Sequence, residues 1–252
     1  MEKKTIALVL SGGGNRGAIH IGVLHAFDEY NINIDTISGT SAGAIIGALY
    51  CSGLSALELK DILDSQTIRK MLNLRFAKDG IADMKSLRRL LETNIQHNSY
   101  DKLKKKLFVC ASDIYEADYE IFSDGDLISH VCASASVPII FKPLIINNKH
   151  YVDGGLFNNL PVEPVLNKYD TVIGVHVNNY KIGGSLGYKV IAKQVFSVVI
   201  KHNVKRNMKL CDFVIDPILE KSYRNFSKKT TNELFEIGYK EGIAFLKQNK
   251  FI

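Results

Sequence analysis

The chain has 252 residues, of which 46% are hydrophobic and 23% charged. This composition is close to that of ordinary globular domains, so it excludes disorder, collagen-like repeats and low-complexity sequence as the main content. Lys and Arg number 32 against 26 Asp and Glu, and the net charge of +6 fits an anionic membrane surface, an acidic substrate or a nucleic acid without selecting among them.

The predicted elements alternate between strands and helices. The run Thr5–Leu10 is short, apolar and rich in β formers, which is typical of a strand buried on both faces of a parallel sheet. Ser55 and Glu58 form a capping-box pattern at the start of a helix. Up to residue 111, the sequence predicts strands at 5–10, 36–38 and 107–111, helices at 18–30 and 42–51, and mostly helical structure at 60–107, most clearly at 84–96.

The second half of the chain continues this alternation. It predicts a hairpin from the strand at 119–122 and the turn pair at 124–125, a helix at 127–136, a turn at 147–148 before a strand that ends at 153, strands at 171–177 and 213–215, and helices at 188–208 and 232–248. Such alternation predicts an α/β domain with a mainly parallel sheet. No linker or repeat divides the chain, so we expect a single domain over residues 1–252.

Neither the cysteines nor the uncharged segments indicate export or a membrane span. The cysteines at 51, 110, 132 and 211 form no C-x-x-C pair, so we expect buried thiols and not a zinc site or a disulfide framework. No charge occurs between Asp35 and Glu58, but the glycines, serines and threonines there favour a buried strand–turn–helix over a span. The apolar run at 5–10 is too short for a signal peptide. We therefore expect a cytoplasmic location.

A first glycine-rich motif, Gly39-Thr-Ser41-Ala-Gly43, lies between a predicted strand and a predicted helix. In a G-x-S-x-G elbow, a nucleophilic serine has strained backbone torsions, and the small residues on either side let the helix pack close to the strand. The partial positive charge at the helix N-terminus favours an alkoxide-like state of the serine. The motif alone fits equally a tight turn in which Ser41 is only a helix cap.

A second glycine-rich loop, residues 12–17, occupies the same place one strand earlier. As G-x-G-x-x-G it is also the dinucleotide fingerprint, whose acidic partner would be Asp35, although Asp35 precedes the second strand instead of ending it. As a run of backbone N–H groups at a helix N-terminus it is an oxyanion hole. Both loops follow consecutive parallel strands, so we expect them to be neighbours, as acyl transfer requires.

A serine nucleophile needs a general base at neutral pH. Only His176 and His202 follow a plausible acid after Ser41, and we expect the first to be a packed core residue and the second to be solvated. Asp153, followed by two glycines, is the better candidate, although Asp-Gly is also a common turn pair. A carboxylate can act as the base if it is partly desolvated and hydrogen-bonded directly to the serine.

The order and spacing of these motifs resemble the patatin-like phospholipase family. The family pattern is a G-G-G-x-R-G loop, a G-x-S-x-G elbow and a distant D-G-G, which this chain has at 12–17, 39–43 and 153–155. The similarity extends to segments 80–91, 133–143 and 153–161 and covers roughly residues 5–180. It implies a three-layer α/β/α fold with a mainly parallel central sheet.

The resemblance also implies a Ser–Asp dyad that needs no histidine, no metal and no other cofactor. Carried over by position, the resemblance makes Ser41 the nucleophile and Asp153 the base. Gly12, Gly13 and Gly14 then line the oxyanion hole, and Arg16 positions the loop or the anion. The remaining motif positions are structural, namely Gly17, Gly39, Gly43, Gly154 and Gly155. Helices between 55 and 105 are where a family member would build a lid or an acyl groove.

The expected substrates are acyl esters of phospholipids, lysophospholipids or related lipids, cleaved through an acyl-enzyme. A transient contact with a membrane surface then becomes the favoured reading of the positive charge, with the lysines at 102–106 and the basic group at 201–209 as candidates to contact headgroups. We expect no nucleic-acid partner, because no recognition motif accompanies the charge. The oligomeric state stays open. The alternatives are a dinucleotide-binding oxidoreductase and a non-catalytic membrane-surface module.

Overall fold

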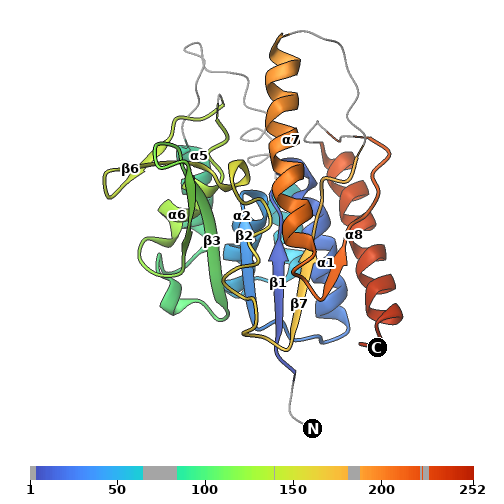
Figure 1. Cartoon of the computed structure of the whole chain (residues 1–252). Coiled ribbons are helices and arrows are strands. Elements are labelled where there is room, and N and C mark those ends of the chain that lie inside the picture. The colour runs from blue at the N-terminus through green and yellow to red at the C-terminus, as the bar shows by residue number, and fades with distance from the viewer. Residues whose placement is uncertain (1–3, 65–83, 139, 181–187, 222, 224–226) are drawn as a thin grey trace.

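The chain forms one mixed sheet whose central strands are parallel (Figure 1). The computed structural model describes residues 4–64, 84–138, 140–180, 188–221, 223 and 227–252, and for residues 188–197 the backbone only. Residues 65–83 of the predicted helical region, which include the first four residues of the 80–91 segment of the family resemblance, lie outside these residues.

The described elements follow one another in the expected alternation. They are β1 (Ile6–Leu10), η1 (Gly14–Arg16), α1 (Gly17–Glu29), β2 (Thr36–Thr40), α2 (Ala42–Cys51), α3 (Ala56–Asp64), α5 (Lys85–Asn94), η2 (Tyr100–Lys102), β3 (Lys106–Asp113), β4 (Asp118–Phe122), α6 (Leu127–Ser134), β5 (Leu144–Ile146), β6 (Lys149–Asp153), η3 (Gly154–Leu156), β7 (Thr171–Val175), α7 (Tyr188–Met208), β8 (Phe213–Ile215) and α8 (Lys228–Gln248), where η denotes a 3₁₀ turn.

The five strands β3, β2, β1, β7 and β8 lie side by side and are parallel. The β5–β6 hairpin and β4 add antiparallel strands at β3. Parallel strands share one carboxyl edge, at the top of Figure 1, and ligands of open α/β sheets bind outside that edge. Both glycine-rich loops follow strands that end there.

Helices cover both faces of the sheet, and strand β1 shows why. Its side chains at 6, 8 and 10 pack into the larger core with α1, α2 and α8, whereas Ala7 and Val9 pack into a second core with Val204 of α7 and residues near 162. In Figure 1, α7 lies on one side of the sheet and α1 and α8 on the other. The predicted three-layer α/β/α fold with a mainly parallel sheet is confirmed.

Two local predictions differ from the structure. The β3–β4 hairpin turns at residues 114–117, where Ala117 has a φ of 53°, and not at 124–125. Asp126, just after that turn pair, instead caps α6 by accepting from the Ser129 N–H. Helix α8 begins at Lys228, four residues before the predicted start, because Ser227 caps it. The turn at Asn147-Asn148 is confirmed, with φ values of 49° and 64°.

The uncharged stretch from 36 to 57 forms β2, α2 and the start of α3, and most of it is buried. It therefore belongs to the packed interior, as expected. Over the part of the chain that the structure describes, we find no helix with the length and apolar character that crossing a bilayer would require.

Candidate active site

Ser41 lies on the sharp turn between β2 and α2, with a φ of 54° and a ψ of −117°. Residues other than glycine rarely adopt a positive φ, so the turn holds Ser41 in a strained conformation. The turn is tight because α2 packs directly on the strand ends. A Cβ atom at Gly43 would collide with the carbonyl oxygen of Leu10, and one at Gly39 would lie 2.6 Å from the carbonyl carbon of Gly43. The strain and the need for small neighbours are as the motif predicts.

The fold brings the carboxyl ends of β2 and β6 together on one edge of β3. Thr40, the last residue of β2, pairs with Cys110, and Asp153, the last residue of β6, pairs with the next residue, Ala111. Strand β4 pairs with both Cys110 and Ala111 along the other edge of β3. Because β2 and β6 run toward each other, Ser41 meets Asp153 although 112 positions separate them in the sequence.

The two side chains form a direct, buried hydrogen bond. The Ser41 hydroxyl donates to Oδ2 of Asp153 at 2.6 Å, and the Gly155 N–H donates to Oδ1 at 2.8 Å. Ser41 is 8% exposed and Asp153 is 4% exposed. Burial raises the pKa of Asp153 to about 6, against the lowering effect of the bonds from Ser41 and Gly155. The carboxylate is thus desolvated and held on both oxygens.

The backbone of Ser41 is held by α6. Its N–H donates to the Ser134 hydroxyl at 2.8 Å, and that hydroxyl donates to the Cys110 carbonyl at 2.6 Å. The carbonyl of Ser136 accepts from the Asp153 N–H at 2.9 Å. The small-residue segment before Pro138 therefore hydrogen-bonds the backbone of both Ser41 and Asp153.

The glycine loop lies beside the Ser41 turn, because a Cβ atom at Gly12 would be 3.1 Å from Cβ of Ser41. The two loops are therefore neighbours, as expected. The Gly12 N–H donates to the Asn159 carbonyl at 3.1 Å. Gly12 thus lines the site, as expected of an oxyanion-hole residue, but its N–H is already bonded and is not a free donor. The N–H groups of Gly13 and Gly14 have no hydrogen-bond acceptor among the described residues.

Arg16 points its guanidinium at Asn178. Its Nε and Nη2 donate to Oδ1 of Asn178 at 3.0 and 2.6 Å, and its Cζ lies 4.8 Å from the centre of the Tyr180 ring. Nδ2 of Asn178 in turn donates to the Gly12 carbonyl at 2.6 Å. Arg16 is thereby linked to the loop that contains it.

The other acid and base candidates lie elsewhere. Asp35 accepts from the Ile6 N–H at 2.8 Å, at the amino end of the sheet, so it lies at the wrong edge to hold a ribose next to the glycine loop. His176 is buried and bonds Oδ1 of Asp216 at 2.7 Å, and His202 is exposed on α7. The hydrogen bond of the Ser41 hydroxyl goes to Asp153.

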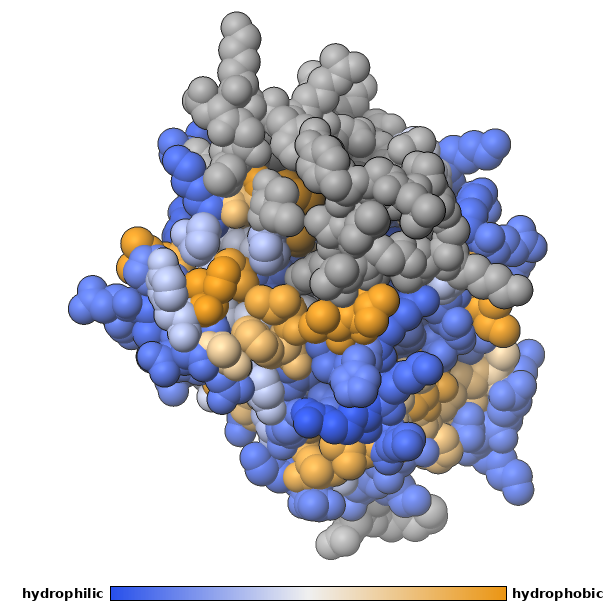
Figure 2. All heavy atoms as spheres, turned by 45° about the horizontal axis from the view of Figure 1, so that its top comes forward, coloured by the Kyte–Doolittle hydropathy of each residue, from blue (hydrophilic) through white to orange (hydrophobic). Residues whose placement is uncertain are grey.

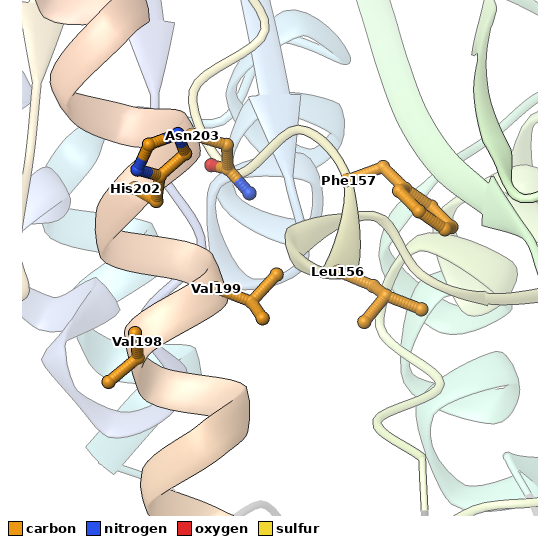
Figure 3. Close-up of a pocket in the computed structure, with 6 residues that line it drawn as sticks. All are labelled: Leu156, Phe157, Val198, Val199, His202 and Asn203. Atoms are coloured by element: carbon orange, nitrogen blue, oxygen red, sulfur yellow. The ribbon is translucent and has the colours of Figure 1, made fainter.

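An apolar pocket of about 390 Å³ opens beside the Asp153 loop (Figure 3). Leu156 and Phe157 form one wall and four residues of α7 the other, namely Val198, Val199, His202 and Asn203. Asn203 joins the pocket to the site, because its Nδ2 donates to the Gly155 carbonyl at 3.2 Å and its Oδ1 accepts from the Asn159 N–H at 3.1 Å.

Sequence reasoning missed the asparagines that surround the loops. Asn159 and Asn178 hold the two sides of Gly12, and Asn203 holds the segment after Asp153. One signal was available, since both asparagine pairs, at 158–159 and 178–179, follow shortly after the carboxyl ends of buried strands. Amides at such positions hydrogen-bond loops to one another.

Known proteins are similar to this chain in sequence and in fold. Patatin-like phospholipase domain-containing protein 6 of Homo sapiens and of Mus musculus is 34% identical over 167 residues, which cover 63% of this chain and 12% of that protein. Neuropathy target esterase sws of Drosophila melanogaster is 31% identical over 171 residues, which cover 65% of this chain and 12% of that protein. The chain thus corresponds to a small part of the length of these relatives.

Solved structures with far lower identity share the fold. The structure of VipD from Legionella pneumophila gives a TM-score of 0.59 at 13% identity and covers 97% of this chain and 67% of that chain. Full-length ExoU, solved with SpcU from the type III secretion system of Pseudomonas aeruginosa, gives 0.53 at 16% identity and covers 97% of this chain and 52% of that chain. A model described as patatin-like phospholipase matches residues 8–166. That match spans more than half of the chain, which therefore belongs to the patatin-like phospholipase family of enzymes.

Proposed function

We propose that the chain is a serine acyl-ester hydrolase that acts on lipid esters, with Ser41 as the nucleophile and Asp153 as the general base. The observation that supports this most is the buried 2.6 Å hydrogen bond between the Ser41 hydroxyl and the Asp153 carboxylate on a strained turn. A nucleophile in direct contact with its base, next to a loop of backbone donors, is the arrangement that acyl transfer needs.

In the first half of the reaction, Ser41 Oγ attacks the ester carbonyl carbon while its proton passes to Oδ2 of Asp153. The carbonyl oxygen becomes an oxyanion, which the N–H groups of Gly13 and Gly14 stabilise. The intermediate then collapses, the C–O bond to the alcohol breaks, and the alcohol leaves with the proton from Asp153. Ser41 remains as an acyl ester.

In the second half, water attacks the acyl carbon and gives its proton to Asp153. Collapse of the second intermediate releases the fatty acid and returns the proton to Ser41 Oγ. Two features help the weak carboxylate base. Its pKa of about 6 lies nearer to neutral pH than that of an ordinary aspartate, and the N-terminus of α2 favours negative charge on Ser41.

We further propose that the substrate is taken from a lipid surface. Figure 2 turns the carboxyl edge of the sheet forward and shows apolar surface among charged residues on that side. Tyr115, after β3, is 77% exposed and Ile218, after β8, is 85% exposed. Contiguous apolar surface marks contact with an apolar partner, and this surface lies at the edge of the sheet that carries the site (Figure 2). The pocket between Leu156 and Val199 is our candidate for the acyl chain, because it is apolar and borders the Asp153 loop.

We propose that residues 1–252 act as one domain, since all the described strands from β1 to β8 belong to a single sheet that carries the whole site.

The test compares wild type with Ser41→Ala on a p-nitrophenyl ester and on a panel of lipid esters, with labelling by a fluorophosphonate. Wild type should be labelled and active, and Ser41→Ala should be neither. Ser52→Ala is the matched control, because Ser52 caps the other end of α2 and its hydroxyl bonds the Leu49 carbonyl. Equal ester hydrolysis by wild type and Ser41→Ala would refute the proposal, and labelling of a protein that turns over no lipid would favour a non-lipid ester as substrate.

A further inference from the structure

Asn178 lies after β7, beyond the end of the family match at residue 166, and is buried against the glycine loop. We propose that Asn178 is a positioning residue, which holds the loop so that the N–H groups of Gly13 and Gly14 are fixed as oxyanion donors. This inference rests on the proposed function and adds to it a residue that none of the three motifs contains.

The orientation of the Asn178 amide is set by its two neighbours. Arginine offers only donors. The atom that accepts from Arg16 Nε and Nη2, at 3.0 and 2.6 Å, is therefore the amide oxygen. The NH₂ group then faces the Gly12 carbonyl, to which it donates at 2.6 Å. Asn178 thus links a charged side chain to one specific backbone oxygen.

Because of peptide geometry, the hydrogen bond from Asn178 to the Gly12 carbonyl also sets the direction of the Gly13 N–H. A peptide bond is planar and trans, so the C=O of Gly12 and the N–H of Gly13 point in opposite directions. Holding the Gly12 oxygen at Asn178 therefore turns the Gly13 N–H away from Asn178. The next peptide repeats the pattern, because the Gly13 carbonyl accepts from the Arg16 N–H at 3.2 Å and the Gly14 N–H points the other way.

The loop needs such support because of its own sequence. Three consecutive glycines have more backbone freedom than any other tripeptide, and Gly14 has a φ of 56°. Preorganised donors stabilise an oxyanion strongly because they need no rearrangement during the reaction, and that advantage is lost in a mobile loop. Val177 touches Gly13 but supplies no hydrogen bond, since its side chain is apolar. The Gly12 carbonyl accepts from two amides, and Asn178 is the closer donor, at 2.6 Å against 3.4 Å for Nδ2 of Asn159.

The test replaces Asn178 by Asp and by Ser and measures p-nitrophenyl ester hydrolysis. Asn178→Asp keeps the acceptor for Arg16 but sets a second oxygen against the Gly12 carbonyl, and Asn178→Ser shortens the side chain out of reach. Asn179→Ala is the matched control, since the side chain of Asn179 bonds Asp216. Rates are expressed per active site titrated to completion with a fluorophosphonate, so that partly unfolded protein does not imitate a loss.

We expect kcat to fall about 10- to 100-fold in both variants, less than the about 100- to 1,000-fold loss when an oxyanion donor is removed, because the donors stay present and only their positions loosen. KM should change less than twofold. The inhibition constant of a trifluoromethyl ketone, whose serine adduct carries an oxyanion, should weaken by the same factor as kcat. Asn179→Ala should leave both values near those of wild type.

Unchanged kcat in a folded Asn178→Ser variant would overturn the proposal, as would a rise in KM alone or a ketone inhibition constant equal to that of wild type. These outcomes are distinct from failure of the proposed function, in which wild type itself shows no hydrolysis that depends on Ser41.

Discussion

Thr40 and Asp153 end their strands at consecutive positions along the same edge of β3, opposite Cys110 and Ala111. One strand reaches this point in the parallel direction and the other in the antiparallel direction. The residue after Thr40 is Ser41, so the register of two separate strands on a third determines the distance between hydroxyl and carboxylate. The 2.6 Å hydrogen bond is a property of the sheet and does not depend on a flexible loop.

This placement predicts a sharp result for Asp153→Asn. The amide has the shape of the carboxylate and can still accept from the Gly155 N–H and donate to Ser41, so the fold should persist. It cannot take the proton of Ser41, and we expect ester hydrolysis to fall by at least about 100-fold, as for loss of a general base. Circular dichroism checks the fold, and a substantial rate in the folded variant would point to another base.

The same substitution should change stability in a manner that depends on pH. The pKa of Asp153 is about 6 in the folded chain against 3.8 for an unperturbed aspartate. The native state therefore binds more protons between these values, so this group's contribution to stability is complete below pH 3.8 and is lost as the pH rises through 6. The Asp153→Asn variant has no carboxyl group to ionise at this position, so its stability does not fall in this way as the pH rises. Its free energy of unfolding should exceed that of wild type by about 2–3 kcal/mol at pH 8 and by little at pH 4. Denaturant titrations at both pH values measure the difference, and equal gains at both would show that the ionisation of Asp153 is not its cause.

The rate should also report the carboxyl group. The log of kcat/KM should fall with unit slope below an apparent pKa of about 6, because protonated Asp153 cannot accept the proton of Ser41. A histidine base would titrate in the same range. Temperature separates the two, since the pKa of a carboxyl group barely changes on warming whereas that of an imidazole falls. Profiles at two temperatures should superimpose on the pH axis, and a clear shift would support a histidine.

Much of this site was predictable because its chemistry follows strand ends. Buried strands, glycine turns and the Asp-Gly-Gly segment each have local signatures, and their order and spacing in the chain identify the family. The place of Asn178 shortly after a buried strand is a weak signal, and its contact with Gly12 arises only where the ends of β1 and β7 meet side by side. The sequence also could not show that the Gly12 N–H donates to the backbone carbonyl of Asn159, because that contact too depends on how distant loops meet. The turn pair at 124–125 misled the prediction because turn residues also precede a capped helix such as α6.

The strain at Ser41 should reverse the usual order of stability between an alanine and a glycine variant at this position. At ordinary positions Ala is more favourable than Gly by about 0.5–1 kcal/mol, because glycine loses more conformational freedom on folding. At a φ of 54° and a ψ of −117°, the methyl group of alanine is strained. Ser41→Gly should therefore be more stable than Ser41→Ala by about 1–2 kcal/mol in denaturant unfolding, with both variants inactive. Alanine as the more stable variant would show that the turn is relaxed.

Contact with a lipid surface should depend on the exposed apolar residues of the carboxyl edge. Tyr115→Ser combined with Ile218→Ser should reduce sedimentation with vesicles of phosphatidylcholine and phosphatidylglycerol while leaving hydrolysis of a soluble ester unchanged. Leu57→Ser is the control, because Leu57 is 52% exposed on α3 and does not follow a strand end. Binding that responds only to salt, and not to these substitutions, would assign the contact to charge alone.

The pocket beside η3 predicts which residue sets the preference for acyl length. Val199 faces the pocket from α7, and Leu156 lines it directly after the Gly155 that bonds the Asp153 carboxylate. Val199→Trp would fill much of a 390 Å³ space, so the ratio of kcat/KM for a long-chain to a short-chain p-nitrophenyl ester should fall about 10-fold, while the short-chain ester is still hydrolysed. Leu210→Trp, on an exposed residue beyond the end of α7, should leave the ratio unchanged. If the two variants keep the same ratio as wild type, the acyl chain binds elsewhere, and the helices between 55 and 105 become the next region to test.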